Sequence, residues 1–229
     1  MVRFKGVFLS LLLLLFGSTT VFALPSLCDW GFNINNVTYE FLEGDSPPLE
    51  LDQSVFNWDT GLGTLSIEFT AATAMDYSII AFFDHEIDEM DNTFFNEFGT
   101  AIGTPDAAQS WEIDEPGYFD GDIYDNLLDG TLDNTVGTSI YGDTTFPDDV
   151  SMALGWDLSL LEGDILNIDF LISETVPTSG FYLEQNDPDS DYSIYFSSTA
   201  TVTPVPEPAT ILLLGAGLVG FIVGRKYFA

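Results

Sequence analysis

The chain has very few basic side chains. Its 229 residues include four Lys and Arg against 37 Asp and Glu, which gives a formal net charge of −33 at pH 7. The four basic residues lie near the two ends of the chain, and none lies between Lys5 and Arg225. Because binding to phosphates requires Lys or Arg, nucleic acids and anionic membrane surfaces are excluded as electrostatic partners. The carboxylates also lack cations to pair with, so we expect salt or divalent ions to relieve their mutual repulsion.

Cysteine and histidine are almost absent. Cys28 is the only cysteine, so no disulfide forms within the chain, and we expect its thiol to be buried as a small apolar group. His85 is the only histidine and stands between Asp84 and Glu86, whose charges favour the protonated imidazole. We therefore expect a solvated loop histidine that is a poor catalytic base. The several His or Cys ligands of a zinc site are missing as well.

The first 23 residues have the pattern of a secretory signal peptide. A short basic region precedes an apolar run from Val7 to Phe16, and the segment closes with residues that suit signal peptidase. We expect cleavage between Ala23 and Leu24, and the alternative is an N-terminal anchor that stays uncleaved. A lipoprotein signal requires a small residue before the cysteine, where this chain has Leu27.

The stretch 204–229 combines a proline-rich start, an apolar run at 209–224 and a basic end. A helix over the apolar run reaches about 24 Å, which is short for a bilayer core of roughly 30 Å. The Arg225 and Lys226 stems can extend it, and their charges favour the cytoplasmic side, which places the rest of the chain outside. The prolines predict an extended, exposed spacer. The alternatives are a buried C-terminal helix and an ordinary membrane anchor that remains uncut.

The order and spacing of these features resemble the PEP-CTERM sorting tail. The residues that carry the resemblance are Val205, Pro206, Glu207 and Pro208, followed by the membrane-stop pair Arg225 and Lys226. The resemblance implies a Gram-negative bacterium that makes extracellular polysaccharide. It also implies processing by an exosortase, a membrane cysteine transpeptidase, near the Pro-Glu-Pro triplet. Since the tail is the substrate of that enzyme, it carries no catalytic residue of its own.

Residues 24–203 predict one acidic, extracytoplasmic all-β domain. Its many aromatic side chains argue against disorder, and short alternating segments between turn residues predict a single β-sandwich or jelly roll of about ten strands. The expected strands are 36–42, 65–70, 77–83, 110–114, 118–124, 151–160, 165–173, 181–183 and 192–196. We expect no amphipathic helix, apart from a helical turn within Asp84–Phe98. The block Asp149–Trp156 is similar to the central domain of many PEP-CTERM proteins, which implies a sandwich without an assigned activity.

Calcium is the metal that this composition favours, because it prefers hard oxygen ligands. Asp187, Asp189 and Asp191 have the alternate spacing that opens many calcium loops, although Tyr192 stands where an EF-hand has its glycine. Further acidic clusters lie at Asp84–Asp91, Asp120–Asp125 and Asp148–Asp149.

Glu-Ile-Asp-Glu occurs at 112–115 and at 86–89. Both copies resemble the start of the catalytic strand of jelly-roll laminarinases, in which alternate carboxylates supply the nucleophile and the acid. The trailing glutamate of that motif is missing from both copies, so we expect no enzyme.

Together these features predict an exported, non-enzymatic protein of the cell surface or extracellular matrix. Signal peptidase and exosortase are the expected processing enzymes, the inner membrane holds the precursor through its C-terminal helix, and extracellular polysaccharide is the expected partner. The first alternative is a calcium-dependent carbohydrate-binding module, and the second is a glycoside hydrolase.

Overall fold

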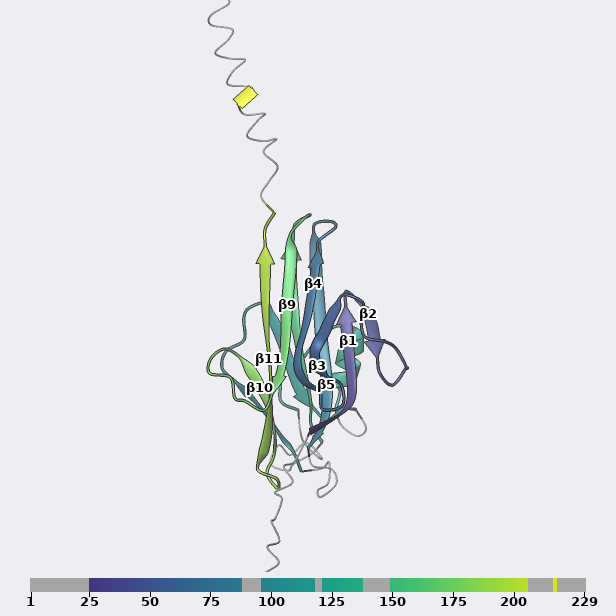
Figure 1. Cartoon of the computed structure of the whole chain (residues 1–229), viewed down its shortest axis with the longest axis vertical. Coiled ribbons are helices and arrows are strands. Elements are labelled where there is room, and N and C mark those ends of the chain that lie inside the picture. Colours follow the sequence, from purple (N-terminus) through teal and green to yellow (C-terminus); the bar gives the residue numbers. More distant parts are fainter. Residues whose placement is uncertain (1–24, 88–95, 118–120, 138–148, 206–215, 218–229) are drawn as a thin grey trace, which may run out of the picture.

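The protein folds as a β-sandwich (Figure 1). The computed structural model describes residues 25–87, 96–117, 121–137, 149–205 and 216–217. Within these ranges eleven strands form two sheets in which neighbouring strands are antiparallel, and one short helix covers part of one sheet. The expected all-β sandwich is confirmed.

The first sheet has the strand order β2-β1-β5-β8-β7, and the second has the order β3-β4-β9-β11-β10-β6. The elements are β1 (Pro25–Ile34), β2 (Val37–Glu40), β3 (Leu51–Asn57), β4 (Leu62–Thr70), β5 (Met75–Ile87), β6 (Phe98–Ile102), β7 (Gln109–Asp114), α1 (Ile123–Asp129), β8 (Ser151–Leu160), β9 (Ile165–Ser173), β10 (Tyr182–Asp187) and β11 (Tyr192–Thr203). Both sheets therefore combine strands from distant parts of the sequence.

The main core lies between the sheets and is rich in phenylalanine. β9 shows why: Leu166, Ile168, Phe170 and Ile172 alternate with more exposed residues, so one face of the strand is apolar and buried. The ring of Phe83 in the first sheet meets that of Phe196 in the second edge to face, with centroids 5.3 Å apart. Burying one such side chain contributes about 1.5–3 kcal/mol.

A second, smaller core lies on the outer face of the first sheet, beneath α1. Ile123 and Leu127, one helical turn apart, are fully buried against Phe82 and Ala153. The helix ends at Gly130, whose φ of 72° suits a left-handed cap. The expected absence of an amphipathic helix is thus wrong, because two apolar residues suffice when a sheet lies beneath them. The strand expected at 118–124 is wrong over 121–124, and residues 118–120 lie outside the described ranges.

Two other expectations need correction. The helical turn expected within Asp84–Phe98 is wrong where it can be seen, because residues up to Ile87 continue β5 and pair with β1; residues 88–95 lie outside the described ranges. Cys28 is exposed rather than buried, since the register of β1 shifts between Leu27 and Asp29.

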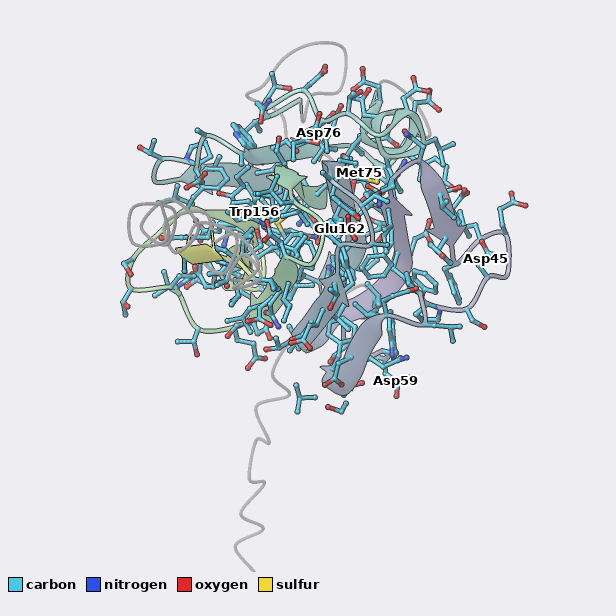
Figure 2. All side chains as sticks on the ribbon, turned by 90° about the horizontal axis from the view of Figure 1, so that it is seen from above. Asp45, Asp59, Met75, Asp76, Trp156 and Glu162 are labelled. Carbon is cyan, nitrogen blue, oxygen red and sulfur yellow. The ribbon has the colours of Figure 1, made fainter. Side chains whose placement is uncertain are left out.

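Several exposed acidic side chains lie at the periphery of the sandwich. Figure 2 shows Asp45 and Asp59 at its outer edge, and both are exposed, as are Asp76 and Glu162. These positions lie in or beside turns, where carboxylates remain hydrated.

The two expected processing segments fall largely outside the described residues. This applies to Ala23 and Leu24 of the expected signal cleavage site, to the Pro-Glu-Pro triplet, to the basic pair and to all of 209–224 except two residues. Among the described residues, no helix has the length and apolar character that crossing a membrane requires.

Candidate functional site

A row of aspartates crosses the outer face of the first sheet. His85 of β5 faces the core, so strand alternation turns Asp84 to the opposite side. Asp84 lies opposite Asp29 of β1. Ser151 of β8 pairs with Asp84 on one side and with Asp114 of β7 on the other. Asp29, Asp84 and Asp114 therefore form one aspartate row across four adjacent strands.

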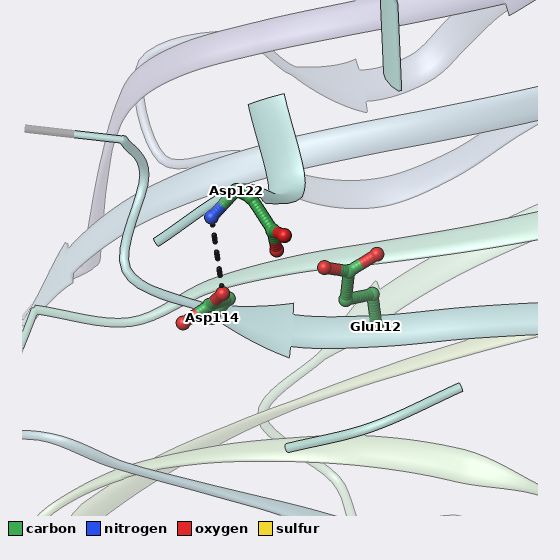
Figure 3. Close-up of side chains that lie close together, drawn as sticks. All are labelled: Glu112, Asp114 and Asp122. Carbon is green, nitrogen blue, oxygen red and sulfur yellow. Dashed lines mark hydrogen bonds between the residues drawn. The ribbon is translucent and has the colours of Figure 1, made fainter. Parts of the chain in front are cut away.

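One end of this row belongs to a group of three carboxylates, Glu112, Asp114 and Asp122 (Figure 3). One oxygen from each lies within 4.8 Å of the other two. Glu112 and Asp114 come from alternate positions of β7 and are buried, whereas Asp122 precedes α1 and is exposed. Across the described ranges this is the one group of three side chains with metal-ligating spacing.

Protein donors satisfy these carboxylates. The Asn126 side-chain amide of α1 donates to both oxygens of Glu112, at 3.0 and 3.1 Å, and to Asp122 Oδ1 at 3.3 Å. The Asp133 backbone N–H donates to Glu112 Oε2 at 3.0 Å. The Asp122 backbone N–H donates to Asp114 Oδ2 at 3.1 Å, which is the bond drawn in Figure 3. The group is therefore an oxygen-rich site that α1 and the segments around it hold together.

Burial makes the side chains of Glu112 and Asp114 weaker acids, because it raises the pKa of each. It raises the pKa of Glu112 to about 7, against hydrogen bonds from Asp133 and Asn126 that lower it. It raises the pKa of Asp114 to about 6, against backbone hydrogen bonds that lower it. A divalent cation with oxygen ligands would hold both groups ionised.

The other end of the row borders a cavity of about 270 Å³. Asp29 and Asp84 line it, together with Cys28, Leu42, Pro116, Gly117 and Tyr124. The lining therefore combines the two aspartates with residues of the turn after β7 and of α1. The sequence pattern did not single out Asp29, because its pairing with Asp84 depends on the strand order.

His85 differs most from the sequence-based expectation. It is fully buried, and its Nε2 lies 3.3 Å from the carbonyl oxygen of Gly61. Burial lowers its pKa to about 4, so it is neutral at pH 7. The expected solvated, charged histidine is wrong, because Asp84 and Glu86 point to the opposite face of the strand.

The calcium loop expected at Asp187, Asp189 and Asp191 stays a prediction. Asp187 is buried at the end of β10, and Asp189 and Asp191 lie in the turn before β11. The side-chain amide of Asn96 bridges Asp187 and Asp189, at 3.3 and 2.9 Å. The Asp189 backbone N–H also donates to Asp187 Oδ1 at 2.8 Å, so the Asp187 carboxylate stabilises the turn that follows it.

The Glu-Ile-Asp-Glu copy at 112–115 lies on β7, and its first two acids share the outer face. Its last acid, Glu115, instead accepts hydrogen bonds from the backbone N–H groups of Gly117 and Gly121, at 3.2 and 3.1 Å. It therefore holds the turn after the strand. The second copy falls partly on residues outside the described ranges.

A second hollow, of about 360 Å³, has aromatic walls formed by Trp30, Phe41 and Trp58. Trp30 and Trp58 have ring centroids 5.3 Å apart, and Phe41 is half exposed. Gln53 accepts a hydrogen bond from Trp58 Nε1 at 2.6 Å and lines the same hollow. This combination of aromatic walls and a few polar groups is typical of small-ligand sites.

The last strand leads straight into the proline-rich tail. β11 ends at Thr203, beside the turn that joins β8 to β9. The Val205 backbone N–H donates to Asp164 Oδ1 of that turn at 3.3 Å, and Val205 itself is half exposed. The tail thus starts at the sandwich with no intervening linker.

The fold and its tail define a class: an acidic β-sandwich that continues directly into a C-terminal processing segment. Residues 204–226 match the family described as the PEP-CTERM protein-sorting motif. The chain therefore carries the sorting tail of PEP-CTERM proteins, and the resemblance seen in the sequence is confirmed. No curated protein and no solved structure matches the chain. The motif marks an exported protein that exosortase processes.

Proposed function

We propose that the protein is a non-enzymatic component of the cell surface or extracellular matrix that associates with extracellular polysaccharide. The observation that carries this proposal is the sorting motif, which begins one residue after β11 ends. Processing near Pro206 to Pro208 releases the sandwich from its membrane segment and leaves it free to enter the matrix.

The charge of the sandwich supports this role. All but one of the 37 acidic residues lie between the expected signal peptide and the tail, in a region without Lys or Arg. Such a surface repels anionic membranes and keeps the protein soluble after release. It also favours contact with neutral glycans, or with anionic ones through divalent cations.

The test is fractionation of cells that express the protein with and without an active exosortase. We expect the protein in the polysaccharide fraction only with the active enzyme, and we expect polysaccharide-degrading enzymes to release it. Replacing Pro206, Glu207 and Pro208 by alanine should hold it at the inner membrane, whereas the exposed control Glu162→Gln should behave as the wild type. Wild-type protein that stays with the inner membrane, or that leaves the matrix without polysaccharide digestion, would contradict the proposal.

The aromatic-walled hollow favours a second candidate function, carbohydrate binding by the sandwich itself. Flat aromatic faces such as that of Trp58 suit stacking against sugar rings, and Gln53 and Asp45 line the same hollow as polar partners. We expect Trp58→Ala to weaken retention in affinity electrophoresis with the host polysaccharide. Tyr182→Ala, a partly buried aromatic of β10 that does not line the hollow, is the control. Equal retention of both variants and the wild type would exclude this site.

A further inference from the structure

Asp29 and Asp84 form an unusual pair, because two buried carboxylates lie directly opposite each other on adjacent strands. They are register partners in β1 and β5 and are 8% and 7% exposed. Like charges placed opposite each other in a sheet destabilise it, and burial strengthens the repulsion. The pair therefore needs something that compensates its charge.

The protein supplies little compensation. Asp29 Oδ1 accepts a hydrogen bond from the Trp30 backbone N–H at 2.7 Å. Asp84 Oδ1 is buried and has no hydrogen-bond partner among the described residues. No Lys or Arg lies between Lys5 and Arg225, and the imidazole of His85 is on the opposite face of β5. Burying a carboxylate oxygen without a hydrogen-bond donor is costly, and a bound ion or water would account for it.

The surroundings of Asp29 and Asp84 further disfavour their ionised forms. Burial is the main cause that raises the pKa of Asp84 well above its ordinary value, and Asp149, Glu86 and Asp29 add repulsion. Burial likewise raises the pKa of Asp29 to about 6. Either protons or a cation must neutralise the pair. The cavity that Asp29 and Asp84 line has room for an ion and its water ligands, and it connects the pair with solvent.

We propose that Asp29 and Asp84 bind a calcium ion in the cavity between β1, β5 and the turn after β7. Two carboxylates supply up to four hard oxygens, and calcium completes six to eight ligands at 2.3–2.6 Å with water or carbonyl oxygens. Cys28 also borders the cavity, but a soft thiol contributes little to calcium binding. The site does not depend on the proposed matrix role, since it concerns the sandwich alone.

The test uses the full chain in detergent and measures calcium binding by isothermal titration and by the melting temperature at constant ionic strength. We expect one saturable event and a higher melting temperature for the wild type. We expect Asp84→Asn and Asp29→Asn to weaken binding about tenfold or more, because ligand charge sets calcium affinity. Asp76→Asn, an exposed acid on the same strand β5, is the matched control and should bind as the wild type.

Stability in EDTA separates lost binding from lost folding. Asparagine keeps the shape of aspartate and removes the buried charge, so Asp84→Asn should melt at or above the wild-type temperature in EDTA and yet show no calcium shift. A wild type without a saturable calcium shift would overturn the proposal. So would a shift that Asp122→Asn abolishes and Asp84→Asn retains, since the ion would then bind the Glu112 group. Binding of zinc in preference to calcium, lost in Cys28→Ser, would also overturn it.

Discussion

The pH of the solution should change the free energy of unfolding through Glu97, and the protein should become less stable as the pH rises. Glu97 is 1% exposed just before β6. Its Oε1 accepts a hydrogen bond from the Ile87 backbone N–H at 3.1 Å, and its Oε2 accepts one from the side chain of Gln185. Burial outweighs both bonds and raises the pKa of Glu97 from 4.5 to about 9. The folded protein therefore holds this side chain neutral at pH 7.

The sign and size of the effect follow from proton linkage. Between pH 4.5 and about 9 the unfolded chain has lost this proton and the folded protein has kept it, so stability falls as pH rises through that window. His85 opposes the trend only below pH 6.5, because its pKa is lowered to about 4 and the unfolded chain then takes up the extra proton. Between pH 8 and 6.5, Glu97 alone should add about 2 kcal/mol to the free energy of unfolding.

The assay is urea unfolding at several pH values from 8 to 6.5. EDTA removes divalent ions, and high salt screens the repulsion between exposed charges. Over this range the wild type should gain about 2 kcal/mol more stability than Glu97→Gln, whose side chain cannot ionise. Glu162→Gln, on an exposed turn, should show the same change of unfolding free energy with pH as the wild type. An identical pH dependence of the wild type and Glu97→Gln would refute the reasoning.

Three substitutions test the packing and the tail junction, each by urea unfolding. Phe83→Ala removes a fully buried ring between the sheets and should cost about 3–5 kcal/mol; a loss below 1 kcal/mol would contradict the core assignment. Gly61→Ala should cost about 1–3 kcal/mol, because φ is 66° and the new Cβ would lie 2.0 Å from His85 Nε2; unchanged stability would mean that His85 is not packed there. Asp164→Ala removes the acceptor for the Val205 N–H and should cost about 1–2 kcal/mol, with faster limited proteolysis near Val205; unchanged proteolysis would show that this contact does not hold the tail.

Strand periodicity predicted much of the sandwich. β9 and the last part of β8 show the expected alternation of buried and more exposed side chains, because one face of each strand packs against the opposite sheet. The first half of β8 is buried on both faces, which α1 explains. The helix itself escaped prediction because its apolar face consists of Ile123 and Leu127 alone, and the strand order depends on contacts between residues far apart in sequence.

The candidate site was only partly predictable for a related reason. Glu112 and Asp114 stood out as alternate acids on one strand, and Asp122 stood out in a separate cluster, but the return of the chain before α1 brings them together. His85 shows the opposite error. Its charged neighbours in sequence suggested a charged imidazole, yet adjacent residues of a strand face opposite sides and see different surroundings.

The intact mass of the protein from each cell fraction tests the central claim of exosortase sorting most directly. Tryptic mapping would not serve, since no Lys or Arg lies between Lys5 and Arg225. Sorting predicts an outer or extracellular form whose C-terminus lies near Pro206 to Pro208, with or without added mass. A single species that retains residues 209–229 in the inner membrane would contradict the claim and show that the tail is a permanent anchor.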